Sequence, residues 1–393
     1  MVLAIMLHAI TPHLPSLLEF CSAYWQSSPE DICIDSILAS RAGDVPDGYV
    51  PRPSLDSSFA KYVANADVRY VVSVGPRGCG KSVGIVAAAQ NHAGVISITF
   101  SGDKDASDVY NRVLAKVCPG FLAPGALVDE RFLKDLFGKA ITSWKQQGGQ
   151  GFWVPTIIAE LDRGSTDGVV VDVAKAIKRL GSDTKSCRAV LVLSDAHAAF
   201  ALPKDDDRIE LLWVDDFTYS EAHLFLDKAD FFLTSKDSAS KAQREDVFHR
   251  IGTRAARLER MVAKVHDQVE LDYFVRNVTD DARDILVRLT KPDLSMKSPS
   301  AEDMKHLVFE LLDSPSSTVL AATLPGVLSK PNEVAPLLKK YHAVLYHYPS
   351  KTYRFYSPAY YHAAVEMFGS SRGTAAVLLL FVTLCVCCCC CCC

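Results

Sequence analysis

Apolar residues recur along the middle of the chain in short continuous runs, and a stretch with helical periodicity separates most runs from the next. The strand-length runs are VRYVVSVG, GVISITF, VPTIIAEL, RAVLVLSD and IELLWV, which begin at residues 68, 94, 154, 188 and 209. Helical patterns start at Lys81 and cover 106–117, 129–146 and 170–180. This alternation is typical of a parallel sheet covered by helices on both faces. It predicts an α/β domain with a five-stranded parallel sheet that ends near Asp216.

The pattern changes after this region, because strand-like runs stop and amphipathic helices follow from 219 to about 278. Farther on, AVLYHYPSKTYRFYSP at 343–358 alternates apolar and polar positions on both sides of a Pro-Ser-Lys turn, which predicts a β-hairpin. Helices followed by one hairpin suggest a winged-helix module. The predicted segments are an N-terminal helical segment, the α/β domain, a helical lid, a winged-helix-like module and an apolar tail, over 1–45, 46–218, 219–297, 298–368 and 369–393.

Length and composition fit a globular protein of two or three domains. The chain has 393 residues, of which 49% are hydrophobic and 22% charged, and 42 basic residues stand against 46 acidic ones. These values exclude long disorder, a collagen-like chain and a globally basic nucleic-acid coat. A stretch rich in proline, glycine, aspartate and serine, at 40–56, is expected to be a linker before the compact domain.

The cysteines are distributed very unevenly. Eight of the 13 lie in the last nine residues, and the other five form no CxxC pair and have no histidines at zinc-finger spacing. The sequence therefore predicts neither a disulfide framework nor structural zinc, and it favours a reducing, cytoplasmic location. The apolar N-terminus lacks a basic residue before its apolar run, which favours a folded or fraying helix over a signal peptide.

The C-terminal tail has two interpretations. The nineteen residues from Ala375 to Cys393 carry no charge and follow Arg372, so they are just long enough to cross a bilayer as a helix. The alternative is a low-complexity tail without a structural role, because no packing or ligand geometry requires seven consecutive cysteines. A membrane anchor and a low-complexity tail both remain open.

The most specific motif is GPRGCGKS at 75–82, which fits the phosphate-loop pattern G-x-x-x-x-G-K-[ST]. It follows a predicted buried strand and precedes a predicted helix, as this motif requires. Glycines let the loop turn its backbone N–H groups toward phosphate oxygens, and the helix N-terminus adds partial positive charge. Lys81 would contact the β and γ phosphates, and Ser82 would hold Mg²⁺. The predicted nucleotide-binding residues here are Gly75, Pro76, Arg77, Gly78, Cys79, Gly80, Lys81, Ser82 and Val83.

A phosphate loop needs an acidic residue at the end of a second strand, and two strands compete for this role. PTIIAELD at 155–162 places Glu160 and Asp162 at the end of one strand, and AVLVLSD at 189–195 ends with Asp195. Chain order favours the first as the acidic strand and the second as a neighbouring sensor strand. Glu160 is then the predicted general base, Asp162 a predicted Mg²⁺ ligand, and Asp195 a catalytic residue that senses the γ-phosphate. Each acid could instead be a solvated carboxylate at a strand end.

These motifs together resemble the AAA+/STAND superclass of P-loop ATPases, especially the archaeal-type ATPases, over about residues 46–368. The resemblance also rests on SDAHAAFALP at 194–203 and IELLWVDDFTYSEAHLFL at 209–226. It implies that HRIGTRAARL at 249–258 is a lid motif in which Arg254 or Arg257 touches phosphate. Ala159 stands where the family usually has its Mg²⁺ aspartate, which puts hydrolysis in question.

The predicted function is a nucleotide-dependent switch that binds ATP and Mg²⁺ and hydrolyses ATP. A non-hydrolysing nucleotide-binding module is one alternative, and the NTPase part of a mobile-element or effector-type protein associated with nucleic acid is another. The predicted partners are ATP and either another protein or further copies of the chain. Support for nucleic acid is weak, because the expected recognition helix PNEVAPLLKK offers only Lys339 and Lys340 as cations.

Overall fold

We describe the fold from a computed structural model of the chain. It describes residues 28–64, 70–100, 109–119, 128–150, 153–161, 166–183, 185–193, 195–202, 209–233, 237–291 and 299–369. Three predictions lie outside these residues: the helix before residue 28, the Mg²⁺ ligand Asp162, and the tail after 369.

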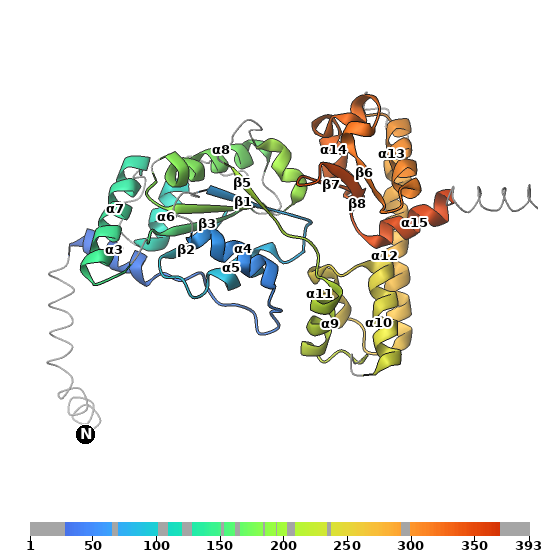
Figure 1. Ribbon diagram of the computed structural model, residues 1–393, viewed down its shortest axis with the longest axis horizontal. Coiled ribbons are helices and arrows are strands. Elements are labelled where there is room, and N and C mark those ends of the chain that lie inside the picture. Colours follow the sequence, from blue (N-terminus) through green and yellow to red (C-terminus); the bar gives the residue numbers. More distant parts are fainter. Residues whose placement is uncertain are drawn as a thin grey trace, which may run out of the picture.

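A five-stranded parallel sheet forms the centre of the N-terminal half, as the sequence predicts (Figure 1). Its strands lie in the order β2-β3-β4-β1-β5, so the strand before the phosphate loop is between β4 and β5. The carboxyl ends of β1, β3, β4 and β5 therefore meet at one edge of the sheet. The strands are β1 (Tyr70–Val74), β2 (Val95–Phe100), β3 (Thr156–Leu161), β4 (Arg188–Leu193) and β5 (Glu210–Trp213).

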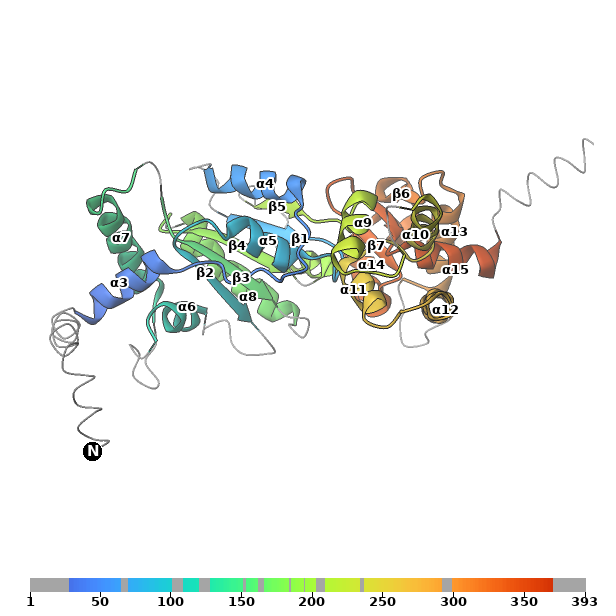
Figure 2. The same ribbon diagram turned by 90° about the horizontal axis from the view of Figure 1, so that it is seen from below.

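Helices cover both faces of this sheet (Figure 2). Side chains alternate along β1, so Tyr70 and Val72 face one layer while Val71 faces the other. α4 (Pro53–Ala64) and α5 (Lys81–Ala89) pack on the Val71 face. The opposite layer contains α3 (Pro29–Ala39), α6 (Val109–Val117), α7 (Glu130–Gln146) and α8 (Asp167–Lys178), with a π-helical turn at Arg179–Asp183. The expected linker at 40–56 is shorter than predicted, because α4 already begins at Pro53.

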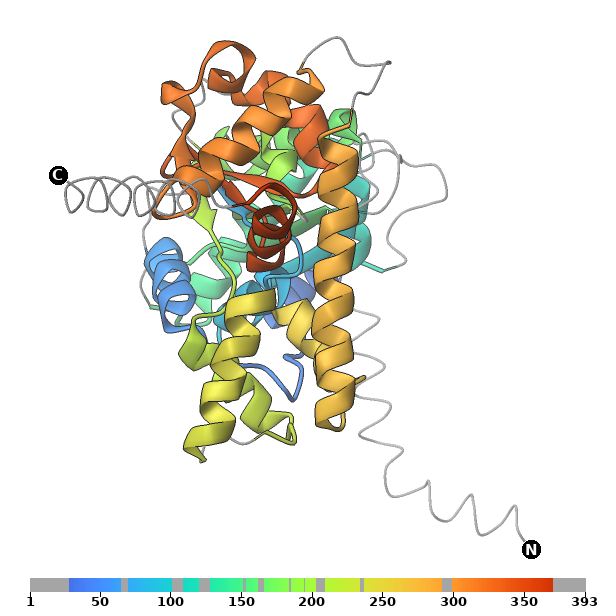
Figure 3. The ribbon, with the colours of Figure 1, turned by 90° about the vertical axis from the view of Figure 1, so that its right-hand side faces the viewer.

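Four helices follow the sheet, where the sequence predicts a helical lid. They are α9 (Tyr219–Lys228), α10 (Ser238–Ile251), α11 (Ala255–Val262) and α12 (Gln268–Leu289). Phe248, Leu258 and Leu271 belong to a separate apolar core shared by these helices. Figure 3 shows α12 passing both the other three helices and the C-terminal part of the chain, so it connects the two regions along its length.

The C-terminal module combines helices with a small antiparallel sheet. The predicted hairpin is present as β7 (Val344–His347) and β8 (Thr352–Phe355). A third strand, β6 (Thr318–Leu320), pairs with β8 and was not predicted, because three residues carry too little alternation. The other elements are α13 (Ala301–Asp313), two 3₁₀ turns at Ala321–Thr323 and Gly326–Ser329, α14 (Pro331–Tyr341) and α15 (Pro358–Phe368). The assignment of this module as a winged helix stays a prediction. Within the described residues, no helix is both long and apolar enough to cross a membrane.

The prediction that the chain lacks disulfides is wrong for one pair. Cys33 in α3 is bonded to Cys118, which directly follows α6, across 85 residues of sequence. Both side chains lie in the apolar core beside the sheet. Neither cysteine has a spacing signature, because only packing of α3 beside α6 brings them together. The count of scattered cysteines therefore no longer supports a reducing compartment.

We expect the Cys33–Cys118 bond to stabilise the fold substantially, since it closes a loop of 85 residues in the unfolded chain. Loop-closure entropy for this length corresponds to about 4–5 kcal/mol. Urea denaturation of the C33A/C118A variant should therefore show a free energy of unfolding lower than that of the parent by an amount of this order. Reductant should lower the stability of the parent but not that of the variant. Equal stability of the parent with and without reductant would contradict the bond.

Candidate functional site: the phosphate loop

The phosphate loop connects the end of β1 to the start of α5 and packs tightly against β5. A Cβ atom added to Gly75 would lie 2.0 Å from the carbonyl oxygen of Val214, so only glycine fits there. Gly78 and Gly80 have φ angles of 75° and 89°, which side-chain-bearing residues rarely adopt. Cys79 is buried, and its thiol donates a hydrogen bond to the Val214 carbonyl at 3.2 Å. Burial raises the pKa of this thiol, so Cys79 packs as a small neutral side chain.

Lys81 is the first residue of α5 and is folded back over the loop. Its side chain is buried, and Nζ donates hydrogen bonds to the carbonyls of Gly75 at 3.0 Å and Pro76 at 2.8 Å. No side chain caps α5, because Gly80 occupies the N-cap position. The first N–H groups of a helix have no intrahelical acceptor, so this terminus offers donors and partial positive charge to an anion. Val83 is more exposed, at 37%, on the first turn.

The acidic strand β3 reaches the loop through Glu160. The Ser82 hydroxyl donates a hydrogen bond to Glu160 Oε1, which joins the start of α5 to the end of β3. Ala159 is fully buried in the core, so its position offers no ligand to the loop. The structure thus places Glu160 against the hydroxyl of Ser82, the predicted Mg²⁺ ligand, while the role of Glu160 as general base stays a prediction. A carboxylate beside a serine hydroxyl is an oxygen donor set that suits Mg²⁺.

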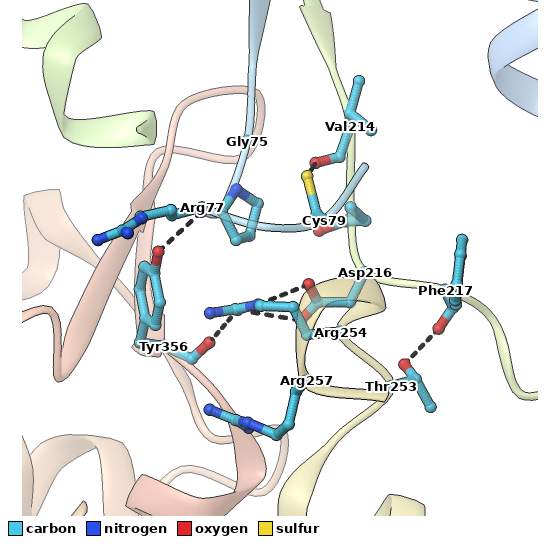
Figure 4. A network of polar contacts seen from close by, with 12 residues as sticks. Gly75, Arg77, Cys79, Val214, Asp216, Phe217, Thr253, Arg254, Arg257 and Tyr356 are labelled. Atoms are coloured by element: carbon cyan, nitrogen blue, oxygen red, sulfur yellow. Dashed lines mark hydrogen bonds and ion pairs between the residues drawn. The ribbon is translucent and has the colours of Figure 1, made fainter. Parts of the chain in front are cut away.

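The lid motif also lies against the phosphate loop (Figure 4). Arg254 is buried at the N-terminus of α11, and the Ala256 N–H donates to the Gly78 carbonyl at 3.0 Å. The Arg254 guanidinium forms two hydrogen bonds with the Asp216 carboxylate, at 2.9 and 3.0 Å. Burial opposes the charged form of Arg254, but Asp216 outweighs it and raises its pKa. The predicted second sensor therefore reaches the loop region, where it is paired with a carboxylate.

Arg257 lies one turn farther along the same helix and donates a hydrogen bond to the Ile251 carbonyl. Burial and the neighbouring Arg254 lower its pKa to about 10. The two guanidinium groups repel each other, so a negatively charged group between them would be favoured.

Tyr356, directly after β8, is a contact that the sequence analysis missed. Its hydroxyl accepts a hydrogen bond from the Arg77 N–H at 2.7 Å, and its backbone carbonyl accepts one from Arg254 at 2.6 Å. Its ring centroid lies 4.2 Å from the Arg254 guanidinium, which is a cation–π distance. Burial raises the pKa of the Tyr356 hydroxyl, so it stays a neutral acceptor. The C-terminal module therefore contacts both the phosphate loop and the lid arginine.

Arg52 was also missed, because it lies in the segment expected to be a linker. Its side chain is buried and donates to the carbonyls of Cys79 and Asp215, both at 2.9 Å. It thus ties the phosphate loop to the segment after β5. Its burial, which comes from packing against distant segments, was not apparent from the sequence pattern.

Asp195 lies in a different cluster from Lys81 and Glu160. It follows β4 and caps a 3₁₀ turn at Ala196–Ala201, where it accepts from the His197 N–H at 2.8 Å. Its carboxylate oxygens are 3.2 Å from His197 Nδ1 and from His342 Nδ1. Burial opposes ionisation of Asp195, but the two histidines outweigh it and hold the pKa of the carboxyl below its usual range. Its role as a γ-phosphate sensor stays a prediction.

The only two cations that the sequence offers on the expected recognition helix, α14, both contact other residues of the protein. Lys339 forms an ion pair with Asp167 of α8, and the Lys340 ammonium lies 5.0 Å from the centroid of the Tyr341 ring. Pairing of Lys339 with Asp167 lowers the positive charge that this helix can offer to a phosphate backbone.

The Arg254–Asp216 pair is expected to stabilise the packing of α11 beside the phosphate loop. Truncation of Arg254 to alanine leaves a carboxylate that is only 24% exposed without its partner. We expect the free energy of unfolding to fall by about 3 kcal/mol. As a control, R283A removes two exposed pairs, with Asp280 and Glu366, in which Arg283 is 43% exposed and each carboxylate 52%, so its effect should stay at about 1 kcal/mol or less. Urea denaturation of R254A, D216N and the double variant measures the coupling, and strictly additive losses would contradict it.

Comparison with known proteins shows likeness in structure but not in sequence. No protein-family model and no curated protein matches the chain. Among solved structures, a Walker-type ATPase of Pyrococcus abyssi superposes with a TM-score of 0.51 at 11% identity, and the match covers 84% of this chain and 99% of that one. Drosophila ORC bound to DNA matches with a TM-score of 0.30 at 12% identity, over 86% and 92% of the two chains. The chain has the fold of a P-loop NTPase and resembles the archaeal-type ATPases.

Proposed function

We propose that this protein binds ATP together with Mg²⁺ at the phosphate loop and hydrolyses ATP as a nucleotide-dependent switch. The observation that carries the proposal is the convergence of Lys81, Ser82 and Glu160 at one end of the sheet. Lys81 and Ser82 open α5 directly after the loop, and Ser82 is hydrogen-bonded to the carboxylate of the acidic strand. This is the set of groups that binding and cleavage of a nucleoside triphosphate require.

Each group has a role in the proposed reaction. The loop N–H groups and Lys81 bind the phosphate oxygens, and Lys81 exchanges its carbonyl partners for them. Ser82 and Glu160 fit Mg²⁺ as oxygen ligands, and when bound the ion neutralises charge on the β and γ phosphates. A water oxygen attacks the γ-phosphorus, the bond to the bridging oxygen breaks, and ADP and phosphate form. Glu160 would accept the proton of that water.

The switch is supported by the contacts that surround the loop. The Arg77 N–H is hydrogen-bonded to Tyr356 of the C-terminal module (Figure 4). The Gly78 carbonyl is hydrogen-bonded to Ala256 of the lid, and the Cys79 carbonyl to Arg52. An incoming triphosphate changes the charge at this junction, so it alters the balance between these contacts. Nucleotide state would thereby control how the lid and the C-terminal module sit on the sheet. Another protein, or further copies of the chain, would recognise that change.

Phosphate release from ATP, measured with and without Mg²⁺, tests this function. We expect steady-state release that needs Mg²⁺ and saturates with ATP. ATP binding without release would indicate a non-hydrolysing module, and the absence of binding would exclude the proposal. A parallel arm with double-stranded DNA at two salt concentrations tests the nucleic-acid alternative, for which salt-dependent binding is required.

A further inference from the structure

A second polar cluster lies between the NTPase sheet and the C-terminal module. Asp195 follows β4, His197 lies in the 3₁₀ turn that Asp195 caps, and His342 ends α14. One ligand atom from each residue can be chosen so that all three lie within 4.8 Å of one another. Neither the phosphate loop nor its proposed chemistry uses the two histidines.

His197 is the most informative member. Its side chain is fully buried, yet neither ring nitrogen has a hydrogen-bond partner among the described residues. A neutral imidazole carries one donor and one acceptor, so burying both without partners is unfavourable. Nδ1 faces Asp195 Oδ1 at 3.2 Å without forming an aligned hydrogen bond. A cation between the two atoms would supply the missing partner.

The spacing also fits a metal ion. Asp195 Oδ2 lies 3.2 Å from His342 Nδ1, as Oδ1 does from His197 Nδ1. Two ligand atoms that each lie about 2.1 Å from a tetrahedral zinc ion are roughly 3.4 Å from one another. Two imidazoles and one carboxylate form a donor set that suits zinc-class ions and leaves a fourth position for water. Asp195 and His197 are two residues apart, but His342 comes from a distant part of the chain, so no sequence spacing reveals the complete set.

We propose that Asp195, His197 and His342 bind one divalent transition-metal ion of the zinc class, which fastens the C-terminal module to the NTPase sheet. The ion would join the end of β4 to the end of α14, which packs on the 3₁₀ turn. It would also lie close to Tyr356, whose ring centroid is 6.3 Å from that of His197 and 5.7 Å from that of His342. The Tyr356 hydroxyl accepts a hydrogen bond from the Arg77 N–H of the phosphate loop. The metal would therefore hold the C-terminal module in the position in which Tyr356 contacts Arg77.

Zinc content of the full chain tests the proposal. The parent and the variants H342N and H197N are treated with chelator, dialysed against Zn²⁺ and then against buffer, and the bound metal is counted by mass spectrometry. Asparagine suits position 342, since His342 has a φ of 51° and asparagine tolerates that conformation. Any zinc bound by the cysteine-rich tail is common to all variants, so only the difference counts. We expect the parent to hold one zinc per chain more than either variant, while H266N, which changes an exposed histidine, matches the parent.

Two further measurements separate this site from the tail and from misfolding. Co²⁺ at an imidazole and carboxylate site gives visible d–d bands without thiolate charge-transfer bands, whereas Co²⁺ bound by tail cysteines gives both kinds of band. The d–d absorption should therefore be weaker in H342N than in the parent, while any charge-transfer bands stay unchanged. Added Zn²⁺ should raise the melting temperature of the parent and not that of H342N, whose melting in chelator shows that it is folded. Equal zinc content in the parent and both histidine variants, or no zinc in the parent, would overturn the proposal. None of these readouts depends on nucleotide, so they are independent of the proposed ATPase.

Discussion

Replacing Lys81 with alanine is expected to abolish measurable ATP turnover and to weaken ATP binding by about tenfold to a hundredfold. The reason is that a hydrogen bond to a charged group contributes about 1.5–3 kcal/mol. The Lys81 ammonium already lies against the phosphate loop, where it is hydrogen-bonded to the carbonyls of Gly75 and Pro76. A small rearrangement of this side chain would therefore bring it to a bound phosphate. Loss of a charge that stabilises the transition state lowers turnover by a further factor of about 10²–10³. ATP titration and phosphate release measure the two effects separately.

Because Lys81 is buried, the alanine variant needs a structural control. K81M keeps the aliphatic stem without the charge, and its melting temperature should stay close to that of the parent. K61A, which removes an exposed lysine on α4 of the same domain, should bind and hydrolyse ATP like the parent. If K81M binds ATP as tightly as the parent, the phosphate loop is not the nucleotide site.

The E160Q variant is expected to lower ATP turnover by about 10²–10⁴-fold while the protein stays folded. Glutamine keeps an oxygen that accepts the Ser82 hydrogen bond, so the junction between α5 and β3 remains, but the negative charge and the proton acceptor are lost. Single-turnover phosphate release at saturating Mg²⁺ measures the chemical step. Unchanged release would remove Glu160 from the reaction.

The same variant distinguishes two roles for this carboxylate. If Glu160 is only a base, the Mg²⁺ concentration that supports ATP binding should be the same in E160Q and in the parent. If it also supports the ion beside Ser82, as the hydrogen bond between them favours, E160Q should need more Mg²⁺. E210Q is the matched control, because Glu210 is exposed at the opposite end of the same sheet and should not alter either measurement.

Local sequence patterns predicted the sheet and the loop because the forces that form them act over short distances. Continuous β-branched runs bury on both faces, so β1 to β5 were found within one or two residues of their ends. The glycines and Lys81 of the phosphate loop form a contiguous motif whose geometry depends on its own backbone. The hairpin β7–β8 was found for the same reason, since alternation and a turn lie within one short segment.

Contacts between distant segments were missed. Arg77 and Tyr356 are 279 residues apart, and Cys33 and Cys118 are 85 apart. No periodicity links such residues, since each pair meets only after separate elements have packed. The lid was an intermediate case, because resemblance to a family indicated Arg254, whereas its partner Asp216 became evident only from the fold.

The sequence by itself determined a parallel α/β domain, a phosphate loop with Lys81 and Ser82, and a strand that carries Glu160 near its carboxyl end. These features follow from hydrophobic pattern and backbone requirements that act within a few residues. The tertiary structure decided what surrounds the loop: Arg52, Arg254 and Tyr356 converge on it from three parts of the chain. It also formed the Cys33–Cys118 bond and the Asp195 cluster, because apolar burial brings helices together whatever their separation in sequence.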